Sequence, residues 1–130
     1  MLPLVNEAVE PYVAKAGECL AGARSELANG RYNNAANRAY YAAYNAAIVA
    51  LLRAGVNSRS WGHGEVQASF ARELIHRRKV FPTSHRKLLP ELDTMRSRGD
   101  YGRRTTSQRD AIKVVREAEQ FLRIVLEIQS

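Results

Sequence analysis

The chain has 130 residues, 45% of them hydrophobic and 25% charged, and its formal net charge is +7. This length predicts one domain over residues 1–130, because a core of this size can bury most of its apolar surface. No run approaches the roughly 18 apolar residues of a membrane span, which excludes a transmembrane protein, and the single cysteine excludes a disulfide framework. The amino-terminal segment lacks the basic leader of a secretory signal, so we expect a cytoplasmic protein without a membrane partner.

Apolar residues recur at alternating spacings of four and three in the first segment, which predicts a helix over residues 5–28. Pro11 lies in the first part of this segment, so the alternative is a helix that starts near Pro11, with the proline in its opening turn. We expect Gly30 just beyond the end of the helix. Residues 31–54 contain neither glycine nor proline and are apolar around much of the helix circumference. This segment is therefore predicted to be the central helix of the fold.

The glycines and serines of residues 55–64 predict a loop, and a short helix follows over residues 65–75. A fourth helix is predicted over residues 84–95, with Ser84 as its cap, although Pro90 would distort or shorten it.

Residues 96–107 are rich in Arg, Gly, Ser and Thr and predict a second loop. Residues 108–128 repeat the three-four spacing of a helix with one apolar face. No segment has the alternating pattern of a strand. The predicted fold class is all-α, an up-and-down bundle of four to five helices.

Several common chemistries find no support in the sequence. It lacks glycine-rich phosphate loops and the nucleophile elbow of hydrolases. Its three histidines, His63, His76 and His85, lack the spacing of metal ligands, and no cysteine pair completes a metal shell. We expect neither a metal nor a cofactor.

Arg38, Tyr41 and Asn45 are predicted to share one face of the central helix, because positions i, i+3 and i+7 lie almost in line. A charged side chain is costly to desolvate in an apolar helix, so Arg38 is expected to face a cleft or meet an anion. The alternative is a structural role, in which Arg38 caps a loop carbonyl or pairs with Asp100.

Three segments occur in a recognisable order: NRAYYAAYN at residues 37–45, GHGEV at 62–66 and MRSRGDY at 95–101. Together they resemble the HEPN superfamily, the higher eukaryotes and prokaryotes nucleotide-binding domain, and above all its small stand-alone prokaryotic branch. The resemblance implies a helical bundle that forms a homodimer and cleaves RNA without a metal at the subunit interface. It also implies a toxin–antitoxin pair, with a small nucleotidyltransferase-type protein as the antitoxin partner.

The resemblance gives four residues a place in the catalytic site. Arg38 matches the motif arginine, which would hold the scissile phosphate, and Tyr41 would stack on a base or donate to phosphate. Asn45 stands where the motif has histidine, and an amide cannot exchange protons near neutral pH. Asp100 would orient Arg38 through an ion pair, or would serve as a plain structural salt bridge.

A wider binding surface is predicted around these residues. His63 matches the loop histidine of the family, although a lone loop histidine is more often a helix cap or a solvent-facing residue. Basic clusters near the loops can grip a phosphate backbone, the alternative being a solvated basic face. The predicted nucleic-acid or nucleotide contacts are Arg38, Tyr41, His63, Arg77, Arg78, Arg96, Arg98, Tyr101, Arg103 and Arg104.

The function that follows is an RNA- or nucleotide-binding protein of HEPN type, which as an enzyme would be a metal-independent ribonuclease toxin. The alternative is a non-catalytic HEPN binding or adaptor subunit, because Asn45 replaces the motif histidine. A third hypothesis is a purely structural helical dimer with a solvated charge.

Overall fold

The computed structural model describes the backbone of residues 2–58, 60–102 and 105–129, and the side chains of residues 8–58, 60–102 and 105–126. These residues form helices and contain no strand, so the predicted all-α class is confirmed. In chain order the elements are α1 (Leu2–Ala28), α2 (Tyr32–Arg53), α3 (His63–Ser69), the π-helical η1 (Phe70–Arg77), the 3-10 turn η2 (Thr83–His85), α4 (Leu88–Tyr101) and α5 (Gln108–Gln129).

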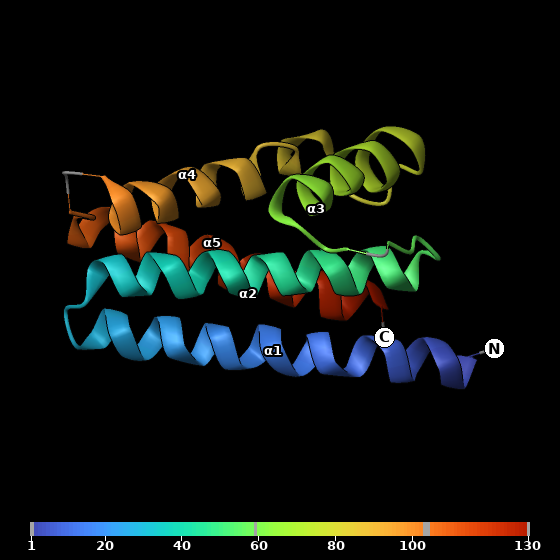
Figure 1. Cartoon of the computed structure of the whole chain (residues 1–130), viewed down its shortest axis with the longest axis horizontal. Helices are drawn as coiled ribbons and strands as arrows, with labels where there is room; N and C mark the ends of the chain where they lie inside the picture. The colour runs from blue at the N-terminus through green and yellow to red at the C-terminus, as the bar shows by residue number, and fades with distance from the viewer. Residues whose placement is uncertain (1, 59, 103–104, 130) are drawn as a thin grey trace.

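The helix α2 lies at the centre of the bundle, as predicted, and contacts α1, α3, α4 and α5 (Figure 1). Its buried alanines, among them Ala39, Ala42 and Ala43, let the neighbouring helices approach closely. α1 and α2 run antiparallel after a tight turn at Gly30, whose φ of 75° suits glycine. Within the described ranges, no helix combines the length and hydropathy that a membrane crossing requires.

Two helices in the first half of the chain differ from the prediction. α1 begins at Leu2, so Pro11 lies inside the helix rather than in an opening turn. Proline removes only one backbone hydrogen bond there, while Val9 and Ala16 on either side of it are buried in the core. The helix predicted over residues 65–75 begins earlier, at His63, and continues as η1 to Arg77.

The helix α4 begins at Leu88 rather than at Ser84, because Ser84 belongs to the preceding 3-10 turn. Pro90 is the third residue of α4. The first four N–H groups of a helix have no acceptor within it, so proline is tolerated at this position.

The loop predicted to begin at residue 96 is wrong, because α4 continues to Tyr101. Arg96 forms ion pairs with Asp93 and Asp100, which stand three residues before and four residues after it. These spacings bring side chains together only on a helix. The continuation of α4 fixes the position of Asp100 relative to α2.

Candidate functional site

Arg38 lies exposed on α2 and has no acidic partner among the described residues. Its aliphatic stem lies over α1, where a Cβ added to Gly22 would be 3.4 Å from Arg38 Cδ. Its Nε and Nη2 donate to Asn37 Oδ1 at 3.1 and 2.8 Å. Its Cζ lies 5.9 Å from the ring centre of Tyr41. A neutral acceptor thus orients the guanidinium while its positive charge stays uncompensated.

Asn45, at the position of the motif histidine, is buried and only 8% exposed. Its Nδ2 donates to the carbonyl oxygen of Tyr41 at 2.8 Å. This is a bond from position i to i−4 within α2, a common arrangement for a short polar side chain inside a helix. The side chain of Asn45 therefore has a structural partner in α2 and little exposure to a ligand.

A second arginine, Arg96, is buried beside the same part of α2, with 11% of its side chain exposed. Its Nη2 lies 2.7 Å from Asp93 and its Nη1 3.2 Å from Asp100. Its Cζ lies 5.3 Å from the ring centre of Tyr40 and 5.8 Å from that of Tyr41. Burial lowers the pKa of Arg96, but Asp93, Tyr41 and Asp100 together raise it by more, so the pKa is above its usual value. Two carboxylates thus balance this buried cation.

Asp100 does not form the predicted ion pair with Arg38. Its Oδ2 accepts hydrogen bonds from Asn37 Nδ2, at 3.0 Å, and from Arg96. Because Asn37 also accepts from Arg38, its amide bridges the two predicted catalytic residues. Asp100 therefore orients Arg38 only through Asn37.

The histidine His63 begins α3 and packs against the tyrosines of α2. Its Nδ1 lies 2.8 Å from Tyr40 Oη, and its Nε2 lies 3.4 Å from Tyr41 Oη. Its ring centre lies 5.3 to 5.6 Å from those of Tyr40, Tyr41 and Tyr44. His63 is therefore half-buried beside the predicted stripe, rather than a helix cap or a solvent-facing residue.

Three residues absent from the sequence prediction complete this cluster: Tyr40, Gln67 and Asp93. Gln67 Nε2 donates to Asp93 Oδ2 at 2.9 Å and to Tyr40 Oη at 3.4 Å. Tyr40 is fully buried, and burial raises its pKa to about 12. The sequence held only one signal for Gln67, its position four residues after His63 on one helix face.

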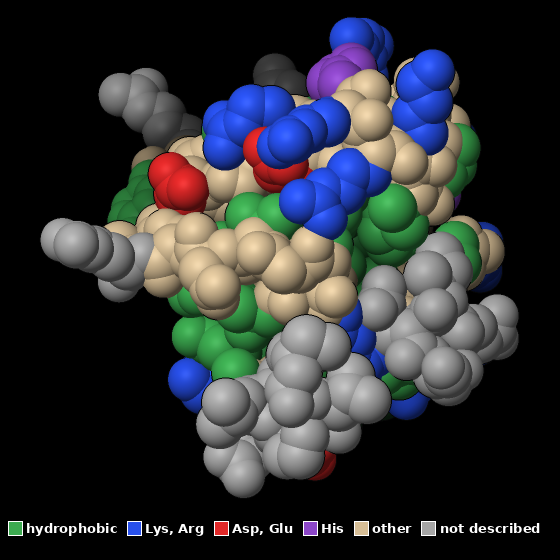
Figure 2. All heavy atoms as spheres, turned by 90° about the vertical axis from the view of Figure 1, so that its right-hand side faces the viewer, with side chains coloured by type: hydrophobic (Ala, Val, Ile, Leu, Met, Phe, Trp, Pro, Cys, Tyr) green, Lys and Arg blue, Asp and Glu red, His purple; other side chains and the backbone are tan. Residues whose placement is uncertain are grey.

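Arg77 and Arg78 lie apart from Arg38. They belong to η1 and the residue after it, beside the carboxyl-terminal half of α2 (Figure 1). Both form ion pairs with Glu73, at 3.1 and 3.8 Å, and Arg72 adds a third at 3.4 Å. Figure 2 shows basic side chains gathered around an acidic one at this end of the bundle. Glu73 therefore neutralises part of the predicted basic cluster.

The last predicted contacts within the described residues are at the end of α4. Tyr101 is 82% exposed, and Arg98 is exposed one turn before it. Arg103 and Arg104 lie outside the described residues. The structure thus places an aromatic ring and a cation at the surface here. Tyr101 directly follows Asp100, which accepts a hydrogen bond from Asn37, the residue before Arg38.

A basic ridge on α5 is formed by Arg109, Lys113, Arg116 and Arg123, none of which is among the predicted contacts. All four side chains are exposed. None forms an ion pair with another described residue. Their spacings of four, three and seven residues place them on one face of a helix, a signal that the sequence carried.

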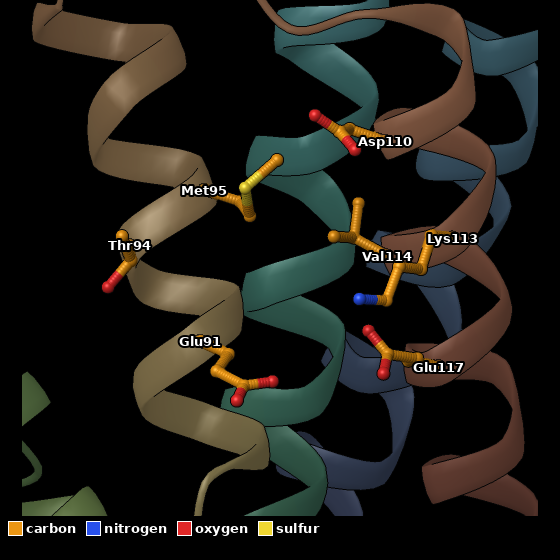
Figure 3. Close-up of a pocket in the computed structure, with 7 residues that line it drawn as sticks. All are labelled: Glu91, Thr94, Met95, Asp110, Lys113, Val114 and Glu117. Carbon is orange, nitrogen blue, oxygen red and sulfur yellow. The ribbon is translucent and has the colours of Figure 1, made fainter.

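A groove of about 230 Å³ lies between α4 and α5 (Figure 3). Met95 and Val114 project into it, and Glu91, Lys113 and Glu117 flank it. Burial raises the pKa of the Glu117 carboxyl. None of the predicted site residues lines this groove, and within the described residues no cluster of His, Cys, Asp and Glu is suited to hold a metal.

The family model described as "HEPN domain" matches residues 9–129. Because the match covers almost the whole sequence, the chain belongs to the HEPN domain family. No curated protein matches the sequence significantly.

Proposed function

We propose that this protein binds RNA through a phosphate group at Arg38, beside the ring of Tyr41, and that the site is non-catalytic. The observation that carries the proposal is the combination of an exposed Arg38, which has no ion pair among the described residues, with a buried Asn45. A guanidinium beside an aromatic ring suits a phosphate and its neighbouring nucleotide. The basic ridge on α5 would add long-range attraction for RNA.

The non-catalytic part of the proposal depends on proton transfer. Metal-independent cleavage of RNA requires groups that take a proton from the attacking hydroxyl and give one to the leaving oxygen. An asparagine amide has no pKa suited to either task, and the Asn45 amide donates to the carbonyl of Tyr41. The adaptor hypothesis is therefore better supported than the toxin hypothesis.

The assembly that we propose follows from the family resemblance. It comprises a homodimer, in which the Arg38 faces of two subunits meet, and a nucleotidyltransferase-type partner. Light scattering on the pure protein tests the first part, with a mass twice that of one chain as the expected result. A monomer at the concentrations used for RNA binding would contradict it.

RNA binding is tested with a fluorescent single-stranded RNA and the Arg38→Ala variant. We expect this substitution to weaken binding about tenfold, because it removes a charged contact to phosphate. Arg53→Ala is the matched control, since it removes the same charge near the other end of α2 and should change the affinity little. Equal affinities of the Arg38→Ala variant and the native protein would contradict the proposal.

A second candidate function, metal-independent ribonuclease, is favoured by one observation: His63 lies within 3.4 Å of Tyr41 Oη. Incubation of the native protein with tRNA in the presence of a chelator tests it. Cleavage that is lost in both Arg38→Ala and His63→Ala would establish this candidate and refute the non-catalytic site. If the native protein does not cleave RNA, Asn45→His is the next variant. Cleavage gained by this substitution would show that the asparagine at position 45 alone prevents ribonuclease activity.

A further inference from the structure

A chain of hydrogen bonds crosses from α4 through α3 to α2 and ends at the hydroxyl of Tyr41. Its members are Asp93, Gln67, Tyr40, His63 and Tyr41, joined at distances of 2.9, 3.4, 2.8 and 3.4 Å. The direction of each bond determines what Tyr41 can offer to a ligand.

The direction is set at the first link. Gln67 Nε2 lies against the carboxylate of Asp93, which only accepts hydrogen bonds, so this atom must be the amide nitrogen. The same nitrogen also lies within hydrogen-bond distance of the Tyr40 hydroxyl, at 3.4 Å. Since an amide nitrogen only donates, the oxygen of Tyr40 is the acceptor in this contact.

The hydroxyl of Tyr40 then donates to His63. Burial raises the pKa of Tyr40 to about 12, so the hydroxyl keeps its hydrogen. Its partner is His63 Nδ1, at 2.8 Å. A neutral imidazole carries one hydrogen, and with Nδ1 accepting, this hydrogen belongs to Nε2.

In the last hydrogen bond, between His63 and Tyr41, the hydroxyl hydrogen of Tyr41 is not used. His63 Nε2 donates to the oxygen of Tyr41, which has no other side-chain or backbone partner among the described residues. The hydrogen of the Tyr41 hydroxyl is therefore available to a ligand. Arg38 lies over the same ring, and its Nη1 makes no hydrogen bond in the described part of the chain.

We propose that Tyr41 Oη and Arg38 together bind one phosphate group of the RNA backbone. Three positioning residues, Gln67, Tyr40 and His63, keep the hydroxyl hydrogen of Tyr41 directed toward this phosphate. The inference rests on the proposed RNA-binding function and specifies its chemistry. Two guanidinium groups lie against the Tyr41 ring. Arg96 is paired with Asp93 and Asp100, whereas Arg38 has no ion pair among the described residues, so Arg38 is the cation that can pair with a phosphate.

The contact itself is tested with Tyr41→Phe, which keeps the ring and removes the hydroxyl. We expect the affinity for a fluorescent single-stranded RNA to fall about tenfold, as for a hydrogen bond to a charged group. Its dependence on salt should stay unchanged, because no cation is removed. Tyr44→Phe is the matched control: its ring also packs on His63, but its hydroxyl makes no hydrogen bond among the described residues. Binding that survives Tyr41→Phe but not Tyr41→Ala would indicate base stacking and overturn the proposal.

The positioning chain is tested in the free protein by the nitrogen chemical shifts of isotope-labelled His63 in mildly alkaline buffer. We expect the hydrogen on Nε2 in the native protein and a mixture of tautomers in Tyr40→Phe, with weakened RNA binding in that variant. A purely structural role of Tyr40 would not change the tautomer. A hydrogen found on His63 Nδ1 in the native protein would refute the proposed order of donors and acceptors.

The outcomes separate this inference from the function on which it rests. If Arg38→Ala weakens RNA binding and Tyr41→Phe does not, the proposed function stands and the phosphate contact of Tyr41 is refuted. If neither substitution weakens binding, both are refuted.

Discussion

Arg96 is the buried cation that joins α4 to the tyrosines of α2. It contacts the rings of Tyr40 and Tyr41, and it is balanced by Asp93 and Asp100. Removing one partner of such a network leaves charges without compensation, which costs more than the ion pair itself contributes.

Arg96→Leu is therefore expected to lower the free energy of unfolding by about 3 kcal/mol, because two carboxylates lose their cation. Urea denaturation followed by circular dichroism measures this change. The control is Arg98→Leu on the same helix, whose side chain is exposed and makes no ion pair with another described residue, with an expected change of about 0.5 kcal/mol or less. Similar effects of the two substitutions would contradict the role of Arg96.

The environment of His85 leads us to expect that the free energy of unfolding decreases in acid. Its ring packs against both Phe81 and Phe121, its Nδ1 is buried without a hydrogen-bond partner among the described residues, and burial lowers its pKa. The folded state thus favours neutral His85. As pH falls through about 6.5, the unfolded chain takes up the proton first and stability decreases.

The measurement is the urea midpoint at about pH 7.5 and about pH 5.5, for the native protein and His85→Phe. We expect a smaller decrease in the variant, because it has no histidine to protonate at this position. An equal decrease in both proteins would show that His85 does not contribute.

Helix periodicity related only those residues of the candidate site that lie on α2, whereas His63 and Asp100 were assigned to the site from the family resemblance. The spacing of Arg38, Tyr41 and Asn45 defined their shared face. His63 could not be placed, because its contact with Tyr41 joins residues 22 positions apart on different helices. The expected pair of Arg38 and Asp100 failed for a similar reason, since a neighbouring amide, Asn37, stands between them.

At the scale of elements, the periodic helices were predicted well and the irregular ones were not. The boundaries of α2 and α5 agree within a residue or two, because their apolar spacing continues over the whole helix. The second half of α4 has the composition of a loop, and ion pairs of Arg96 keep it helical. The π-helical turn of η1 left no pattern in the sequence that could be recognised.

Gly99 permits close packing between α4 and the start of α2. A Cβ at this position would lie 3.0 Å from both Asn33 Oδ1 and Thr106 Oγ1. The hydroxyl of Thr106 can rotate away, but Asn33 Oδ1 is held by the Thr106 N–H at 2.7 Å. Substitution of Gly99 must therefore disturb the contact between α2 and the segment before α5.

We expect Gly99→Ala to lower the free energy of unfolding by about 1 kcal/mol, although alanine has the higher helix propensity. In an Asn33→Ala background the same change should become neutral or stabilising, since the obstructing atom is gone. Gly17→Ala is the control: nothing lies within 4 Å of its added Cβ, and it should stabilise α1 by about 0.8 kcal/mol. Stabilisation by Gly99→Ala in the native background would contradict this account.

At the scale of the molecule, the net charge of +7 is distributed unevenly. Glu73 neutralises part of the basic cluster at η1, whereas the ridge on α5 has no acidic partner among the described residues. Lys113 lies on the side of the ridge nearest the groove. None of the four cations has a carboxylate within ion-pair distance in the described part of the chain. The ridge is therefore the surface that should contribute most to long-range attraction for RNA.

Arg116→Gln combined with Arg123→Gln tests the ridge. We expect the plot of log affinity against log salt concentration to become shallower by about 0.7 for each RNA phosphate that the variant no longer binds. Arg24→Gln serves as the control, because Arg24 is already paired with Glu119. An unchanged slope in the double variant would exclude the ridge from the RNA-binding surface.

The most direct test of the central claim is to locate RNA on the protein by the chemical shifts of its arginine side chains during a titration with single-stranded RNA. The account predicts the largest change at the Arg38 guanidinium, with changes at Tyr41 and His63 beside it and little at Arg53. Changes confined to Arg77, Arg78 and the ridge, with Arg38 unaffected at saturation, would contradict it.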